Sequence, residues 1–189
     1  MELNTYPLVC TRGVVLYPNQ EIVIDVGRGA SVHAVENAQD NYDKKICLFS
    51  QKELEQENPG KEDIYPVGTL CEVRHIRRFD NFLRVKFRGI KRVKLNNWIN
   101  GSLSDLAEVE ILESEKQDAV EEEALIRMIA DELDRMQGQD RFVTKEIVME
   151  ISKGMGGEFL SDKAVQGLPL DIERKQQYLE TLGVNDRLM

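Results

Sequence analysis

The sequence of 189 residues is poor in the side chains that most often perform catalysis or bind metals. It holds two histidines and three cysteines, and no two cysteines have C-x-x-C spacing. An odd number of widely spaced cysteines argues against a disulfide framework, and two histidines without clustered carboxylates form no metal-ligand pattern. We therefore expect Cys10, Cys47 and Cys71 to be small core residues of a protein in a reducing compartment.

Long apolar runs and nucleotide-binding motifs are missing as well. No run approaches the ~18 residues of a membrane span, and the N-terminus lacks the apolar stretch of a signal peptide, which predicts a cytoplasmic protein without membrane contact. There is no G-x-x-x-x-G-K-[ST] phosphate loop, and the glycines of residues 154–157 lie between expected helices. A dyad of His33 and Cys47 has no local signature to support it. We expect no catalytic residue, no bound metal and no cofactor in this chain.

Charge is distributed unevenly along the chain. The net charge is −9, yet residues 74–94 contain nine Lys or Arg and one Asp. That segment carries +8 and the rest of the chain −17. Such a block is compatible with phosphate contacts, with an acidic protein surface such as a neighbouring subunit, or with the solvated face of a strand pair.

The alternation of apolar and polar residues predicts a β-rich region in the first 112 residues. Residues 21–26 alternate strictly, apart from Val23, an apolar residue on the face that should be wet. A hairpin is expected where Asp80-Asn81 separates two alternating segments, and Gly89 permits a bend in its second strand. A short helix is expected to begin at Ser31. The expected strands are residues 7–10, 14–17, 21–26, 46–49, 69–79, 82–87, a continuation through 93–95, and 107–111.

Helical spacing of apolar residues replaces this alternation after residue 112. Ser114 and Gln117 fit a capping box for a first helix ending at Gly138. A second helix is expected from Thr144 to Gly154, a third over residues 158–166, and a fourth from an Asp171 cap to Gly183. Asn185 resembles one more N-cap, so the sequence is expected to stop at the start of a further helix, as in a truncated protein. The prediction is an α+β chain with a β-rich part (1–112) and a helical bundle (113–189).

Five segments, in order, resemble the N-terminal domain of the bacterial ATP-dependent Lon proteases. They are residues 9–18 (VCTRGVVLYP), 25–31 (DVGRGAS), the loop of 51–69 with PG and DIYPVGT, 85–92 (VKFRGIKR), and a last segment in two pieces, 175–180 (KQQYLE) and 185–188 (NDRL). Cys10 and Thr11 replace the usual Pro and Leu of the first segment. The usual hairpin turn Leu-Pro-Asp-Gly is replaced by Phe79, Asp80, Asn81 and Phe82.

The resemblance implies a PUA-like β-fold followed by a helical bundle. It also implies a non-catalytic role in recognising unfolded or misfolded proteins, within hexamers of Lon subunits. The ATP, the Mg²⁺ and the Ser–Lys dyad of such serine endopeptidases would belong to modules absent from these residues. Two alternatives stay open, a PUA-like RNA- or DNA-binding module and a stand-alone Lon-like adaptor. The acidic pI of about 4.9 and the lack of interleaved aromatics disfavour nucleic acid.

Capture of unfolded proteins requires accessible apolar surface. Val23 on the wet face of its strand, with Phe79 and Phe82 at the hairpin tip, are the candidate substrate-contact residues. The alternative is that all three side chains fold back onto the domain.

Overall fold

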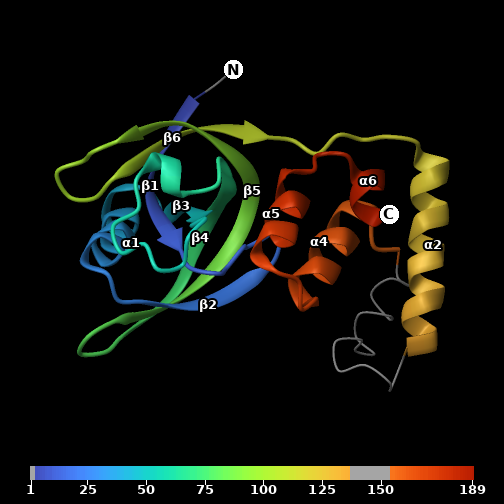
Figure 1. Ribbon diagram of the computed structural model, residues 1–189, viewed down its shortest axis with the longest axis horizontal. Helices are drawn as coiled ribbons and strands as arrows, with labels where there is room; N and C mark the ends of the chain where they lie inside the picture. Colours follow the sequence, from blue (N-terminus) through green and yellow to red (C-terminus); the bar gives the residue numbers. More distant parts are fainter. Residues whose placement is uncertain (1–2, 137–153) are drawn as a thin grey trace. The chain divides into compact units, whose positions relative to one another are not determined.

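The computed structural model describes residues 3–136 and 154–189, and the chain divides into two compact units, 1–112 and 113–189 (Figure 1). The first unit contains a six-stranded sheet and the helix α1, and the second contains helices. The described elements are β1 (Leu3–Thr11), β2 (Glu21–Val26), α1 (Gly29–Asn41), β3 (Lys45–Ser50), the 3-10 turn η1 (Lys61–Asp63), β4 (Val67–Arg78), β5 (Leu83–Ile99), β6 (Leu106–Leu112), α2 (Ala119–Met136), α4 (Gly157–Gly167), α5 (Ile172–Glu180) and α6 (Val184–Leu188). This confirms a mixed fold of strands and helices.

The sheet of the first unit closes on itself. Its strand order is β2-β5-β4-β3-β1-β6, and β6 pairs with β5 as well as with β1. Five strands therefore form a closed ring, and β2 is added outside it against β5. The one parallel pair, β1 with β3, is connected through β2 and α1, as a parallel pair needs a long crossover.

β5 holds this arrangement together because it pairs with three strands. Its first half, from Leu83 to Arg88, pairs with β2, and its second half, from Arg92 to Ile99, pairs with β6. β4 follows its other edge over most of its length. Between the two halves the backbone of Gly89 bonds to the turn before β2, accepting from the Asn19 amide and donating to the Gln20 carbonyl, each at 2.9 Å.

The core of the first unit lies on both sides of the strands. On β3, Ile46 and Leu48 belong to one buried cluster, which includes α1, and Cys47 and Phe49 belong to a second. Burial on both faces explains the continuous apolar run of this strand. All three cysteines are buried, as expected of core residues, and burial raises the pKa of the Cys71 thiol.

The structure corrects one strand expectation in this unit. Residues 15–17 are buried and Val14 is half-buried, but they form no strand; the carbonyls of Val14 and Leu16 bond to side chains instead. The Val14 carbonyl accepts from the hydroxyls of Thr11 and Ser50, and the Leu16 carbonyl accepts from Thr69. The apolar run correctly predicted a buried segment. It did not predict that side chains, and not a neighbouring strand, would bond to the backbone carbonyls.

The helix caps of the second unit differ from the expected ones. α2 begins at Ala119, and Asp118 caps it by accepting from the amides of Val120 (2.8 Å) and Glu121 (3.0 Å). Gln117 instead accepts from the Asn185 amide of α6 at 2.9 Å. The expected cap at Asp171 is confirmed, since its carboxylate accepts from the Arg174 amide at 2.8 Å.

The last helix is also different from the prediction. α5 ends at Glu180 and not at Gly183, which is instead the N-cap of α6. Asn185 is therefore not a cap; its side chain is buried inside the unit. It donates to the Asp118 carbonyl (3.0 Å) and to the Glu121 carboxylate (2.8 Å). A single turn of helix is stable here because tertiary contacts replace the propagation that it lacks.

Some expectations lie outside the described residues. These are the end of the first helix at Gly138 and the helix expected to start at Thr144. Within the two described stretches, no helix is long and apolar enough to cross a bilayer.

Replacing Gly89 with Ala should destabilise the first unit. A Cβ at this position would lie 2.2 Å from the Tyr17 carbonyl oxygen and 2.9 Å from its carbon, so the turn before β2 must shift. We expect the free energy of unfolding to fall by about 1–3 kcal/mol, measured by chemical denaturation. Gly29→Ala is the matched control, since its Cβ meets nothing within 4 Å. Equal stability of the two variants would contradict this packing.

Asn185→Ala should destabilise the second unit, because it leaves the Glu121 carboxylate and the Asp118 carbonyl without this donor. A loss of about 1–3 kcal/mol in the free energy of unfolding is expected. Met189, whose side chain is 77% exposed, provides the control Met189→Ala with an effect within about 0.5 kcal/mol. An Asn185→Ala protein as stable as that control would show that α6 does not depend on these bonds.

Candidate functional site

Val23 lies on the exposed face of β2, as its place in the alternation predicted. It is 56% exposed, while Ile22 and Ile24 on the opposite face pack against the core. Its cross-strand partner on β5 is Lys86. Val23 therefore presents an apolar side chain to solvent.

Two ion pairs border Val23 on either side. Asp25 accepts two bonds from the Arg84 guanidinium, at 2.7 and 2.8 Å, and the Lys86 ammonium lies 2.6 Å from the Glu21 carboxylate. These bonds hold the pKa values of Asp25 and Glu21 below their usual range. Exposed pairs of this kind contribute little stability, so their main effect is to fix where the cationic side chains lie.

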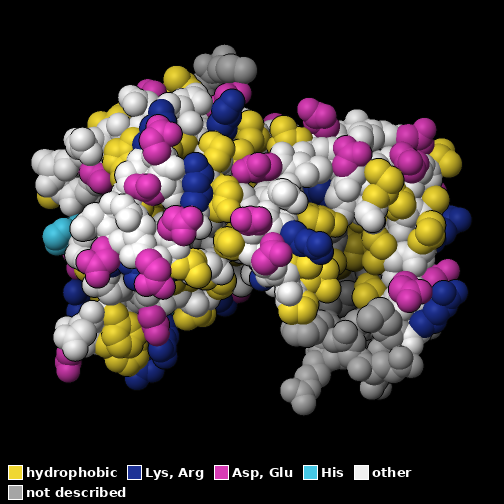
Figure 2. All heavy atoms as spheres, viewed as in Figure 1, with side chains coloured by type: hydrophobic (Ala, Val, Ile, Leu, Met, Phe, Trp, Pro, Cys, Tyr) yellow, Lys and Arg dark blue, Asp and Glu magenta, His cyan; other side chains and the backbone are white. Residues whose placement is uncertain are grey.

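The two aromatic residues of the hairpin tip stack on each other. The rings of Phe79 and Phe82 are 4.7 Å apart between centroids and 13° from parallel, and both side chains are half-buried. The Arg84 guanidinium lies 5.4 Å from the Phe79 centroid and 5.7 Å from that of Phe82, and Arg77 lies 5.1 Å from Phe79. Figure 2 shows apolar and basic side chains together where the β4–β5 hairpin ends, at the lower left.

Arg84 connects these features into one surface. It pairs with Asp25, which lies two residues from Val23 on β2, and at the same time contacts both rings. We call this surface, formed by Val23, Asp25, Phe79, Phe82 and Arg84, the hairpin face. It offers apolar and aromatic contacts bordered by charge.

Part of the basic segment is paired with carboxylates within its own unit. Four of its nine cations are 2.6–3.0 Å from carboxylates of the same unit, three of them on other elements, and Arg92 is buried. The pairs are Arg74–Glu72, Arg78–Glu36, Arg84–Asp25 and Lys86–Glu21. This pattern fits the solvated face of a strand pair.

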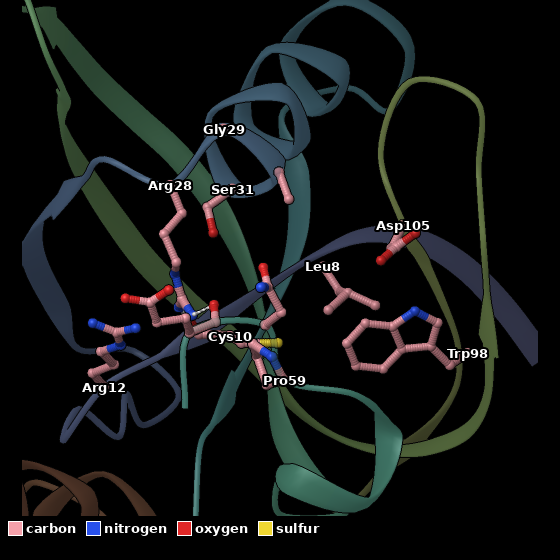
Figure 3. Close-up of a pocket in the computed structure, with 12 residues that line it drawn as sticks. Leu8, Cys10, Arg12, Arg28, Gly29, Ser31, Pro59, Trp98 and Asp105 are labelled. Atoms are coloured by element: carbon pink, nitrogen blue, oxygen red, sulfur yellow. Dashed lines mark hydrogen bonds between the residues drawn. The ribbon is translucent and has the colours of Figure 1, made fainter. Parts of the chain in front are cut away.

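The structure also holds a pocket that the sequence did not predict. Its volume is about 520 Å³, and its walls come from the end of β1, the first turn of α1, the loop before η1, and the end of β5 (Figure 3). Cys10 lines it, and burial raises the pKa of this thiol to about 12. No sequence motif could reveal the pocket, because segments from four parts of the chain meet there.

Comparison with known proteins gives a consistent result over the whole chain. Residues 5–189 match the family described as the ATP-dependent protease La (LON) substrate-binding domain. The Lon protease of Buchnera aphidicola subsp. Acyrthosiphon pisum is 30% identical over 188 residues, covering 99% of this chain and 24% of the relative. That of Syntrophomonas wolfei is 33% identical over 191 residues, covering 99% and 23%. The chain spans about a quarter of the length of these relatives.

Two solved structures share the fold. The N-terminal domain of Mycobacterium avium complex Lon protease aligns with a TM-score of 0.78 at 17% identity, covering 98% of this chain and 94% of that one. A Lon N-terminal domain protein from Xanthomonas campestris aligns with a TM-score of 0.67 at 16% identity, covering 98% and 95%. With the family match over residues 5–189, these observations show that the chain belongs to the Lon substrate-binding domain family.

Proposed function

We propose that this domain captures exposed apolar segments of unfolded or damaged proteins for an ATP-dependent Lon-type protease. The observation that supports the proposal is the hairpin face, where Val23 is 56% exposed beside an aromatic pair. Unfolded chains differ from folded ones chiefly in their accessible apolar side chains, and a surface of this composition can bury them. The domain itself performs no chemistry in this proposal.

The relatives are about four times as long as this chain, so the proposal extends to a longer protein. We infer a first unit that is PUA-like, and a subunit that continues into an ATP- and Mg²⁺-dependent motor and a serine endopeptidase with a Ser–Lys dyad. In a hexamer, whose assembly the domain would aid, six hairpin faces would raise the effective concentration of binding sites. Contacts that are weak one at a time are then sufficient for capture.

A nucleic-acid-binding function is less well supported. Phosphate binding needs cations that are available to exchange their counterions, and four cations of the basic segment already face carboxylates of the same unit. The aromatic pair is stacked ring on ring, which leaves less of each ring face for a base. A stand-alone adaptor would use the same hairpin face, and it differs only in lacking the motor and protease modules.

Phe82→Asp should weaken the capture of an unfolded protein. The substitution places a carboxylate where an apolar segment would pack, and loss of one buried aromatic contact corresponds to an affinity about tenfold lower. The measurement is fluorescence anisotropy of a labelled, permanently unfolded test protein titrated with the 189-residue chain. Thermal unfolding of the variant establishes that the domain remains folded.

The matched control is Leu103→Asp. Leu103 is an exposed apolar residue of the same unit, 64% accessible, in the connection between β5 and β6 and away from the hairpin. The Leu103→Asp variant should bind the unfolded test protein with unchanged affinity. Val23→Asp should lower this affinity, as Phe82→Asp does. Unchanged capture by the Phe82 variant would remove this residue from the site, and equal losses in all three variants would indicate a non-specific effect of added charge.

A further inference from the structure

The pocket beside α1 has the size and the mixed walls of a ligand site. Its volume of about 520 Å³ lies within the usual range for small-molecule sites. A second cavity of about 340 Å³ adjoins it and shares Cys10, Arg12, Arg28 and Ser31 with it. In Figure 3 the polar side chains of Arg28 and Ser31 lie at one end of the pocket, and Leu8 and Trp98 lie at the other.

The first turn of α1 offers amide hydrogen-bond donors from which no described residue accepts. Its N-cap, Arg28, makes no side-chain cap bond, and the first turn contains no acidic residue. The amides of Gly29, Ala30 and Ser31 have no partner among the described residues. A helix start of this kind carries partial positive charge and favours an anion.

The Ser31 hydroxyl provides independent support for a ligand. The residue is 7% exposed, and within residues 3–136 and 154–189 its hydroxyl makes no hydrogen bond. Its oxygen points into the pocket in Figure 3. The Oγ atom is not among the fully buried polar atoms that lack a partner, so it keeps access to the pocket, and a molecule bound there would reach it.

Two guanidinium groups, those of Arg12 and Arg28, also line this pocket. Arg28 donates to the carbonyls of Cys10 and Glu57, and Arg12 donates to the Gln56 carbonyl at 3.2 Å. Neither arginine forms an ion pair with any described carboxylate. Burial and the neighbouring charge of Arg12 lower the pKa of Arg28, so an anion placed between them would relieve an unfavourable arrangement.

The remaining walls restrict the kind of anion. Leu8, Pro59 and Trp98 make an apolar wall that suits a side chain, which inorganic anions lack. Asp105 and Glu57 also line the pocket, and their charges would repel a multiply charged group such as phosphate more strongly than a singly charged carboxylate. The fitting ligand is a singly charged carboxylate that carries an apolar group.

We propose that this pocket binds the C-terminal residue of a polypeptide, with its carboxylate at Ser31, Arg28 and the first turn of α1 and its apolar side chain against Trp98. A free acid of the same chemistry is the other source. The adjoining cavity, with Val9, Ile24 and Val26 in its walls, gives space for a further residue and favours the chain end. The pocket shares no residue with the hairpin face, although Asp25 of that face also lines the adjoining cavity. The proposal does not rest on the function of the hairpin face.

The test uses Trp98, the single tryptophan of the chain, as the reporter. The 189-residue protein is titrated with acetyl-Ala-Leu-Phe carrying a free carboxylate, with its C-terminal amide, with N-acetyl-phenylalanine and with inorganic phosphate. Trp98 fluorescence and calorimetry are recorded together. We expect saturable binding of the free acid, and affinity at least about tenfold lower for the amide, because charged hydrogen bonds are lost.

Each contrary result overturns a defined part of the proposal. Equal affinity for N-acetyl-phenylalanine and the tripeptide would overturn the assignment to a polypeptide end. Equal affinity for the amide, or tighter binding of phosphate, would overturn the carboxylate site. No saturable binding of any probe in calorimetry would overturn the pocket as a ligand site.

Ser31→Ala is the sharper variant, because Arg28 also holds the carbonyls of Cys10 and Glu57 and its removal could disturb the loop. We expect about tenfold weaker binding of the tripeptide for Ser31→Ala. Ser102→Ala, an exposed serine of the same unit, should leave the affinity unchanged. Phe82→Asp should also leave it unchanged, so that failure of this proposal and failure of the hairpin face are distinguishable. Unaltered affinity in Ser31→Ala would remove the hydroxyl from the site.

Discussion

The pairing of β5 with three other strands is the constraint on which the first unit depends. A strand of 17 residues is long enough to carry β2 and β6 one after the other on the same edge. The change of partner occurs at Gly89, where the turn before β2 approaches so closely that any side chain would collide with the Tyr17 carbonyl. This contact fixes where β2 begins, and with it the placement of the hairpin face and of the pocket beside α1.

The position of the hairpin face follows from this pairing. Because β2 lies against the first half of β5, its outer residues come into register with the basic residues of that half. Arg84 then reaches Asp25 on one side and the rings of Phe79 and Phe82 on the other. The pocket depends on the same strand from its second half, since Trp98 is near the end of β5 and α1 follows directly after β2.

The sequence predicted what local periodicity determines. Alternation placed Val23 on the exposed face, identified the hairpin and located β2 and β6. It did not reveal that the carbonyls of Val14 and Leu16 would bond to side chains, nor that Gln117 would cap a helix 68 residues later in the chain. The caps of α2 and α6 show the reason, because Ser, Gln and Asp can all accept from an amide and tertiary contacts decide among them. The pocket was missed for the same reason, since Ser31 and Trp98 meet only in the folded chain.

The hairpin face and the pocket beside α1 differ in whether their arginines have carboxylate partners. This difference indicates which kind of ligand each of them would bind. On the hairpin face Arg84 already has a carboxylate partner, so its charge serves to position it over the rings and does not require a ligand. At the start of α1, Arg12 and Arg28 donate only to backbone carbonyls, and the Ser31 hydroxyl and the first amides have no partner among the described residues. Donors with unmet capacity in a partly enclosed pocket gain more from an anion than exposed cations that are already paired. An apolar segment is therefore the partner expected at the hairpin face, and a carboxylate is the partner expected at the pocket.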